Sequence, residues 1–336
     1  MPSRLPRQSD NTESPMSLTV AIQMDPMESI NINADSSYMM ALEAQARGYK
    51  LYHYLPNAMA YEDGKVIARA NSMKVWRPES GNQADGYFEF GHTEMLDLAE
   101  TDVVLMRQDP PFDMAYITAT HLLDLVKDQT LVVNDPTSVR NAPEKLFATL
   151  FPGLLPPTLI TRDPAMIKAF RETHRDIIVK PIFGNGGAGV FHVTPEDENL
   201  GSLIEMFHAA SREALICQKY LPEIKQGDKR IILIEGEPVG AVSRMPEDGE
   251  ARANFHAGGS ARRTSLTPRE QEICKTIAPA LREQGLLFVG IDVIGDYLTE
   301  INVTSPTGIQ EINGLDGIQI EALMWDAIEK RLEDRR

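Results

Sequence analysis

The sequence predicts a mixed fold of the α/β and α+β classes, with an N-terminal open α/β domain followed by modules built on antiparallel sheets. Up to about residue 139, short apolar strand runs alternate with helical segments in a β-α-β series. Beyond residue 222, strand signals come in hairpin pairs instead. A length of 336 residues with 42% hydrophobic content allows more than one core.

The first elements define the predicted open α/β domain at residues 17–139. Asp35 can cap a helix that ends at Gly48, because aspartate accepts free N–H groups of a first turn and glycine readily ends a helix. Another helical segment is expected at 118–127, and Asn141 is expected to cap the next helix just after a boundary near residue 140. Strands are expected at 18–24, 49–55, 102–106 and 131–133.

The second half of the chain mixes helices with paired strands, which indicates α+β modules. Glu235-Gly236-Glu237 is a strong signal for a tight hairpin turn between two of these strands. Strands are expected at 158–160, 176–180, 189–193, 214–218, 229–235 and 239–244. Helices are expected at about 164–173, 199–210 and 268–284.

Composition excludes several classes of protein. A formal net charge of −16 provides no broad field for phosphate backbones, so we expect no general nucleic-acid partner. No run of about 18 apolar residues suggests a membrane span. Cys217 and Cys274 are too few for a disulfide framework and indicate a reducing, cytoplasmic location. Residues 1–16 have no periodicity and no apolar core of a signal peptide, so we expect a disordered extension, with Met16 as an alternative start.

Three oxygen-bearing side chains interrupt the apolar run 288–306. Glu300 and Asn302 are two residues apart and share one face of a strand, while Asp292 lies on the preceding strand across a short turn. Carboxylate and amide oxygens suit Mg²⁺, and phosphate-bridging ions would offset the burial of these carboxylates. The run therefore predicts a magnesium–nucleotide site. The alternative is an edge hairpin whose polar residues face water.

The register of this hairpin decides between the two interpretations. A strict two-residue turn at Gly295 and Asp296 would turn Asp292 away from Glu300, because successive strand residues face opposite sides of a sheet. One bulge or a three-residue loop would bring the two carboxylates to the same face. We predict such a departure from regular pairing.

A glycine-rich segment supplies a candidate phosphate site. Lys180 ends a strand and is followed by Gly184-Asn185-Gly186-Gly187, whose backbone N–H groups can approach phosphate oxygens without interference from Cβ atoms. The segment matches neither the P-loop nor the dinucleotide-binding fingerprint, and a flexible turn is the alternative. Lys145 is a second candidate cation or an ordinary surface lysine. The strand end at 217–222 either meets an adenine edge or simply stops at a proline.

The order of these segments resembles the ATP-grasp superfamily. The resemblance rests on Glu144-Lys145-Leu146-Phe147, the Lys180 strand with its glycine loop, the strand end at 218–222, Gly227-Asp228-Lys229-Arg230 and the 292–306 hairpin. With five further motifs the chain looks like the bacterial glutathione synthetases over about residues 17–332. These are Met24-Asp25-Pro26, Ile30-Asn31-Ile32-Asn33, Asp35-Ser36-Ser37, the 105–113 segment around Arg107-Gln108-Asp109-Pro110-Pro111 and the 299–307 segment.

The resemblance implies an ADP-forming ligase that joins γ-glutamylcysteine to glycine through an acyl phosphate. ATP is the co-substrate and is bound with two Mg²⁺ ions, which Mn²⁺ can replace. No nucleic acid or membrane takes part. It implies a substrate domain at 17–139, an ATP-grasp lid domain at 140–222 and a C-terminal ATP-grasp domain at 223–332 with a mobile loop at about 245–266. It also implies a cytoplasmic homotetramer.

Site residues follow from the same resemblance, position by position. Arg230 would polarise the reacting carboxylate, and Arg107 would contact a carboxylate of the peptide. Metal ligands would be Asp292, Glu300 and Asn302. The nucleotide would be bound by Lys145, Lys180, Gly184, Asn185, Gly186, Gly187, Gln218, Lys219, Tyr220, Leu221 and Asp228. The substrate would be bound by Asn33, Asp35, Ser36, Arg107, Arg252, Asn302, Thr304, Ser305 and Thr307.

The sequence is also consistent with other interpretations of several residues. Arg230 is otherwise an exposed strand arginine, and Arg107 otherwise forms a structural salt bridge. Ser260 stands where the family pattern has an arginine after paired glycines, so Arg262 or Arg263 would have to replace it. A ligase of different specificity, a nucleotide-binding module without catalysis and a purely structural protein are the other functional interpretations.

Overall fold

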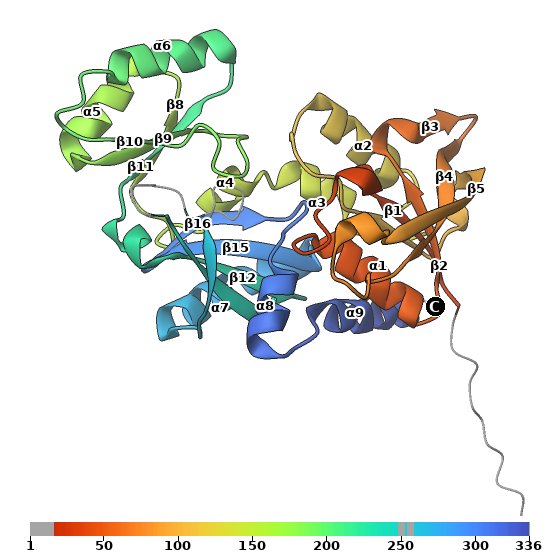
Figure 1. The fold of residues 1–336 in the computed structure, drawn as a ribbon. Helices are drawn as coiled ribbons and strands as arrows, with labels where there is room; N and C mark the ends of the chain where they lie inside the picture. The colour runs from red at the N-terminus through yellow and green to blue at the C-terminus, as the bar shows by residue number, and fades with distance from the viewer. Residues whose placement is uncertain (1–16, 248–252, 254–258, 336) are drawn as a thin grey trace, which may run out of the picture.

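The computed structural model describes residues 17–247, 253 and 259–335, which form three β-sheets with helices against them (Figure 1). The predicted extension at 1–16 and most of the central part of the predicted loop lie outside the described residues. None of the described helices is long and apolar enough to cross a membrane.

The N-terminal sheet has seven strands in the order β3-β4-β2-β1-β6-β7, with β5 paired to β4. The β1, β2, β6 and β7 strands are parallel neighbours and match the predicted strands. Their bounds are Thr19–Gln23 for β1, Lys50–Tyr54 for β2, Val103–Met106 for β6 and Leu131–Val133 for β7. Helices α1 (Ser36–Ala46), α2 (Met114–Asp124) and α3 (Pro136–Asn141) complete this part.

Three antiparallel strands of this sheet were not predicted. They are β3 (Met59–Glu62), β4 (Lys65–Val75) and β5 (Phe88–Asp97). The signal was present: Asp63-Gly64 forms the turn between β3 and β4, and Val66, Ala68 and Ala70 alternate as buried residues along β4. Small alanine side chains weakened the hydrophobic pattern.

Two predicted helix starts were wrong. The α2 helix begins at Met114 rather than at 118, because the Asp113 side chain caps it by accepting from Ala115 N and Tyr116 N. Asn141 does not cap the next helix but ends α3. The α4 helix (Glu144–Phe147) follows Pro143 and has no side-chain cap.

The middle sheet has the order β10-β9-β11-β8 and lies apart from the other two sheets (Figure 1). Its strands match the predicted ones to within two residues at each end, and α5 and α6 cover it on the side away from the rest of the chain. Bounds are Thr158–Thr161 for β8, Ile177–Pro181 for β9, Phe191–Val193 for β10, Leu215–Lys219 for β11, Pro164–His174 for α5 and Leu200–Ala210 for α6. A separate small core fills this unit.

The C-terminal sheet has the order β14-β13-β12-β15-β16, with all neighbours antiparallel. Its predicted turn at Glu235 and Gly236 is confirmed, with φ angles of 52° and 73°. Part of the predicted mobile loop is instead strand β14, paired with β13. Bounds are Asp228–Ile234 for β12, Glu237–Met245 for β13, Ser260–Arg263 for β14, Phe288–Ile294 for β15, Tyr297–Asn302 for β16 and Pro268–Glu283 for α7.

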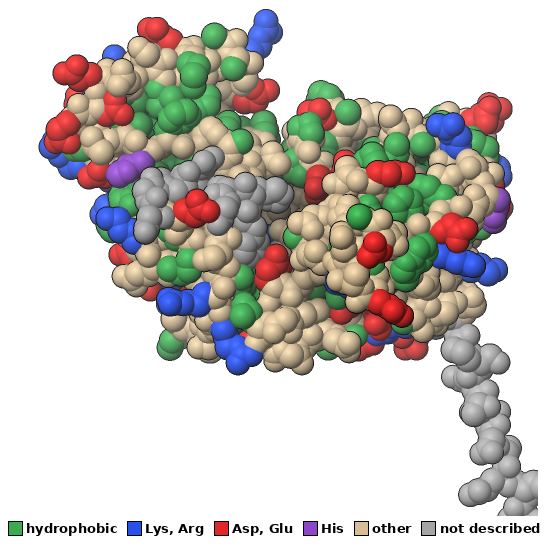
Figure 2. Space-filling model, viewed as in Figure 1, with side chains coloured by type: hydrophobic (Ala, Val, Ile, Leu, Met, Phe, Trp, Pro, Cys, Tyr) green, Lys and Arg blue, Asp and Glu red, His purple; other side chains and the backbone are tan. Residues whose placement is uncertain are grey.

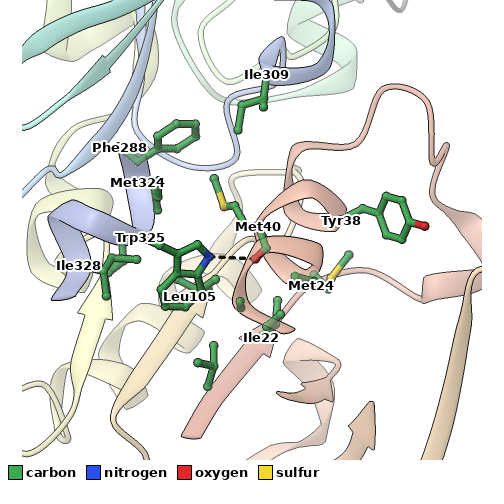
Figure 3. Packing of buried hydrophobic residues seen from close by; sticks show 14 of the residues in the cluster. Ile22, Met24, Tyr38, Met40, Leu105, Phe288, Ile309, Met324, Trp325 and Ile328 are labelled. Carbon is green, nitrogen blue, oxygen red and sulfur yellow. Dashed lines mark hydrogen bonds between the residues drawn. The ribbon is translucent and has the colours of Figure 1, made fainter. Parts of the chain in front are cut away.

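The last two helices return to the N-terminal part of the chain, and no helix was predicted there. They are α8 (Ile309–Asp316) and α9 (Ile320–Asp334). Figure 3 shows Trp325 of α9 packed beside α1, with its Nε1 donating to Met40 O at 2.9 Å. One buried core therefore joins residues from the first and last segments of the described chain. In Figure 2 the surface is hollowed between the middle-sheet lobe and the N-terminal lobe.

Candidate active site

The acidic hairpin has the irregular register that the sequence predicted. Ile294 pairs with Tyr297 and Val293 with Leu298, but a bulge then places Asp292 opposite Glu300. Thr299 is the extra residue, and its Oγ1 donates to Asp292 O at 3.1 Å. The two carboxylates therefore share one face of the β15–β16 pair, whereas regular pairing would have separated them.

Asp292 lies between two buried arginines. Arg230 contacts it through Nε at 2.5 Å and Nη2 at 3.0 Å, and Arg244 Nη2 lies 2.8 Å from Oδ2. Burial opposes ionisation of this carboxyl, but the two guanidinium groups outweigh it and hold the pKa of Asp292 well below its usual range. Asp292 is thus a fully charged oxygen donor.

Glu300 is held by a lysine from the short helix α4. Lys145 Nζ lies 2.9 Å from Glu300 Oε1 and donates to Gly184 O at 2.5 Å, so it joins the acidic hairpin to the glycine-rich loop. The side chain of the neighbouring Glu144 is 15% exposed, and its partial burial together with the charge of Glu300 raises its pKa to about 7. Lys145 is therefore not an ordinary surface lysine, since it is only 3% exposed.

These groups line one cleft between the middle and C-terminal sheets. The cleft encloses about 870 Å³ of space, counting the part open to solvent. Twelve of the predicted site residues line it: Lys145, Lys180, Gly184, Gly186, Gly187, Gln218, Lys219, Tyr220, Leu221, Asp228, Asp292 and Glu300. Burial lowers the pKa of Lys180, which projects from β9 with no carboxylate among the described residues in ion-pair contact. The Tyr220 ring is backed by the His192 ring at 3.9 Å.

A second cavity opens on the N-terminal sheet. It is lined by Asp35, Arg107 and Thr307 from the predicted substrate set, together with Met24, Asp25, Ser29, Ile30, Asn31, Ala34, Asp109 and Glu311. Arg107 is buried at the end of β6, and its nitrogens donate to Ser37 Oγ, Thr304 O and Pro306 O. Among the described residues Arg107 forms no salt bridge, since all three acceptors are neutral oxygens, so the alternative of a structural salt bridge is not supported.

Arg230 lies between the cleft and this cavity. While Nε and Nη2 contact Asp292 of the cleft, Nη1 donates at 3.2 Å to the carbonyl of Thr307, a residue that lines the cavity. Arg230 is 5% exposed, so it is not the exposed strand arginine of the alternative interpretation.

Several predicted site residues lie elsewhere. Asn185 and Thr304 line a small third cavity beside Phe112 and Phe183, whose rings stack at 6.0 Å. Asn302 Oδ1 accepts from the backbone N and the hydroxyl of Thr304.

Asn33, Ser36 and Ser305 line neither main cavity. Asn33 is exposed, Ser36 and Ser305 are buried, and Arg252 lies outside the described residues. Arg262 and Arg263 are exposed on β14, where Arg263 pairs with Asp316.

Sequence reasoning missed Arg244, which is 3% exposed and contacts both Asp228 and Asp292. A bulge in the β12–β13 hairpin puts Asp228 opposite Arg244, whereas regular pairing from the turn would have placed Ser243 there. Pro238 and Gly240 flank the unpaired Val239 and were a local signal for that bulge, because both residue types are common at bulges within strands. Burial raises the pKa of Asp228 to about 6 despite the nearby charge of Arg244.

Comparisons with known proteins identify the family of the chain. Residues 18–140 match the N-terminal domain of prokaryotic glutathione synthetase, and residues 144–317 match its ATP-grasp domain. A glutathione synthetase of Agrobacterium fabrum is 56% identical over 312 residues, covering 93% of this chain and 96% of the relative. One from Pseudomonas putida is 45% identical over 322 residues, covering 95% and 100%.

Solved structures support the fold alone, because their sequence identity is low. D-cycloserine synthetase DcsG superposes with a TM-score of 0.65 at 14% identity, covering 94% of this chain and 99% of that one. The ATP-grasp ligase PsnB gives 0.60 at 19% identity, with the same two coverages. The two matched domains and the glutathione synthetases of 45–56% identity establish that the chain belongs to the prokaryotic glutathione synthetase family of ATP-grasp ligases.

Proposed function

We propose that this chain ligates γ-L-glutamyl-L-cysteine to glycine, forming glutathione, ADP and phosphate. The observation that carries the proposal is the position of Arg230, which contacts the acidic hairpin of the cleft on one side and Thr307 of the N-terminal cavity on the other. A carboxylate held in the cavity and a γ-phosphate held in the cleft would meet beside this guanidinium. Phosphoryl transfer from ATP to the substrate carboxylate would therefore take place beside Arg230.

The N-terminal cavity has the charges that an amino-acid head group requires. Arg107 carries a positive charge whose hydrogen bonds go to neutral acceptors, so it is available to a substrate carboxylate. Four acidic side chains line the same cavity and can accept an ammonium group: Asp25, Asp35, Asp109 and Glu311. Glu311 Oε2 is buried without a hydrogen-bond partner among the described residues, and burial raises the pKa of this carboxyl. The γ-glutamyl group is the part of the dipeptide that carries both charges.

The cleft has the groups that a triphosphate requires. Lys145 and Lys180 are buried point charges, and backbone N–H groups of the glycine-rich loop can approach phosphate oxygens without Cβ atoms in the way. Gln218 to Leu221 line the end of the cleft where the adenine would lie. These nucleotide roles are carried over from the family pattern, residue by residue.

Asp292, Glu300 and Asn302 would hold Mg²⁺. They are hard oxygen donors on one face of a hairpin, and Asp292 is held ionised, so the set fits that ion or Mn²⁺. Among the described residues, no three His, Cys, Asp or Glu side chains form a metal cluster by themselves, so phosphate oxygens and the Asn302 amide would complete the shell. When bound, the metal would neutralise part of the negative charge of the phosphates. Two such ions are expected.

The chain's own residues then act in order. Arg107 and the acidic residues orient the dipeptide, and Lys145 and Lys180 fix the phosphates. The cysteinyl carboxylate attacks the γ-phosphorus, ADP leaves, and an acyl phosphate results. The glycine amine attacks that acyl carbon, Arg230 stabilises the tetrahedral oxyanion, and phosphate leaves as the amide forms. Holding the intermediate in a closed site limits its hydrolysis.

The test is a substrate-omission assay. Purified protein receives ATP, Mg²⁺, γ-glutamylcysteine and glycine, and phosphate release is measured with each component left out in turn. We expect release to require all four. Equal phosphate release without the dipeptide would contradict the proposal and favour a ligase of different specificity. The relatives that are 45–56% identical over more than nine tenths of their length argue against that alternative.

Location and assembly complete the proposal. Cys217 and Cys274 are free and buried, which fits a reducing cytoplasm. The homotetramer that the family resemblance implies is testable by light scattering of the purified chain.

A further inference from the structure

The wall of the N-terminal cavity includes a turn with little regular structure of its own. Residues 30–35 lie between a single 3₁₀ turn and α1, and their internal backbone hydrogen bonds run from Ala34 N and Asp35 N to Asn31 O. Ile30, Asn31, Ala34 and Asp35 line the cavity. Something outside the turn must therefore hold its other backbone groups in place.

Two glutamine side chains do so. Gln310 Nε2 donates to Ile32 O at 3.0 Å and to Asp35 O at 2.9 Å. Gln83 Nε2 donates to Ile30 O at 2.9 Å, and its Oε1 accepts from Ile32 N at 3.4 Å. We call these two residues the glutamine clamp. Both are half-buried, and neither lines the cavity itself.

The two residues come from distant parts of the chain. Gln83 lies in the connection between β4 and β5, whereas Gln310 is in the first turn of α8, beside Thr307 and Glu311, which also line the cavity. Arg77 orients the Gln310 amide, because its Nη2 donates to Gln310 Oε1 at 2.5 Å while its Nη1 donates to Ile32 O at 2.9 Å. Through Gln310 the clamp joins the turn to a second segment that lines the same cavity.

We propose that Gln83 and Gln310 are positioning residues for the dipeptide: they fix the 30–35 turn and so determine how tightly the cavity binds γ-glutamylcysteine. This inference rests on the function proposed above. The clamp touches no residue that lines the nucleotide cleft, so its loss is predicted to weaken dipeptide binding while leaving ATP binding unchanged.

The experiment uses Gln310→Glu and Gln83→Glu in the full chain. Glutamate keeps the size of glutamine but cannot donate, and in Gln310→Glu it still accepts from Arg77, so the substitution replaces the donation to the turn by a negative charge. Gln284→Glu is the matched control, because Gln284 is also half-buried, gains the same charge and lines neither cavity. Thermal unfolding of each variant shows whether it is folded.

We expect Gln310→Glu to raise the KM for γ-glutamylcysteine about tenfold, with the KM for ATP within about twofold of wild type. Gln83→Glu should act in the same direction, and the double variant should fall short of the product of the two effects, since both residues hold one turn. A dipeptide KM equal to that of Gln284→Glu in both single variants, or an equal rise in both KM values, would overturn the inference. Wild-type turnover that needs no dipeptide would overturn the proposed function instead.

Discussion

The nucleotide cleft and the N-terminal cavity are built in different ways. The cleft takes its charged groups from short motifs, such as the α4 lysine and the β15–β16 hairpin, and each motif is positioned by its own strand or helix. The cavity instead takes its walls from a turn, the end of β6 and the start of α8, which side chains from three separate regions hold together. Local sequence thus encodes one site, while long-range packing assembles the other.

The largest expected effect comes from the residue that joins the two regions. Arg230→Ala removes the guanidinium between Asp292 and Thr307, and we expect kcat to fall by about 10²–10³, as for loss of one oxyanion donor. Arg230→Lys should recover only part of the rate, since an ammonium cannot contact two oxygens in the same fork. Steady-state phosphate release measures both variants.

A neighbouring ion pair provides the control for this prediction. Lys229 precedes Arg230 on β12 and contacts Glu270 at 2.7 Å, away from both cavities. Lys229→Ala should reduce thermal stability without a comparable loss of kcat. If the two substitutions slowed turnover equally, Arg230 would be a structural residue rather than the meeting point of the two sites.

The next largest effect is expected from a substitution at Asn134, which joins the N-terminal sheet to the C-terminal sheet. Asn134 follows β7 and makes three buried hydrogen bonds: its Nδ2 donates to Phe288 O and Val303 O, and its Oδ1 accepts from Phe288 N, each at 2.8 Å. Asn134→Ala leaves these groups unsatisfied, which should cost about 3 kcal/mol of unfolding free energy. Chemical denaturation followed by circular dichroism measures the loss.

This substitution also sharpens the comparison. If the cleft depends on local motifs, the Asn134→Ala variant should keep the KM for ATP near the wild-type value while the dipeptide KM rises, because β16 leads directly to Thr304 and Thr307. An equal rise in the KM values for ATP and the dipeptide would indicate that Asn134 stabilises both sites.

The cleft could be predicted from the sequence better than the N-terminal cavity could. Lys145, Lys180 and the acidic hairpin could be predicted as site residues from sequence because each combines a local pattern with a recognisable chemical need. The β16 bulge, which followed from the requirement that Asp292 face Glu300, is confirmed. Gln83, Gln310 and Arg244 were missed because a polar residue on a strand or a helix start is ordinary until its distant partner is known. Likewise, α9 carries buried residues, but only its packing on α1 explains Trp325.

Close packing around Arg230 gives a smaller effect. A Cβ at Gly290 would lie 2.7 Å from Pro306 Cβ and 3.2 Å from Arg230 Cδ, so Gly290→Ala must displace the segment that lines the cavity. We expect a cost of about 2 kcal/mol in unfolding free energy, typical of overpacking. The dipeptide KM should rise more than the KM for ATP.

Gly201→Ala is the matched control, since a Cβ there meets nothing within 4 Å and the residue lies in the first turn of α6. It should leave both KM values unchanged and stabilise the chain by about 0.5–1 kcal/mol, because alanine favours helix over glycine. A Gly290→Ala variant as stable and active as this control would show that the 306 segment moves freely.

The smallest expected effect is a pH dependence confined to the N-terminal region. His53 on β2 is 3% exposed and stacks on Phe90, and its Nε2 contacts Asp25 O at 3.1 Å near the cavity. Burial lowers the pKa of His53 below its usual 6.5, although the Asp25 carbonyl and nearby carboxylates partly oppose that shift. Below pH 6.5 the unfolded chain therefore binds a proton that the folded chain does not, so this residue contributes stability that is present above pH 6.5 and lost as the pH falls.

Between pH 7.5 and 5.5, His53→Gln should lose about 1 kcal/mol less unfolding free energy than wild type, because glutamine does not titrate. Urea unfolding at the two pH values measures this difference, and equal losses in the two proteins would mean that His53 accepts its proton in the folded state.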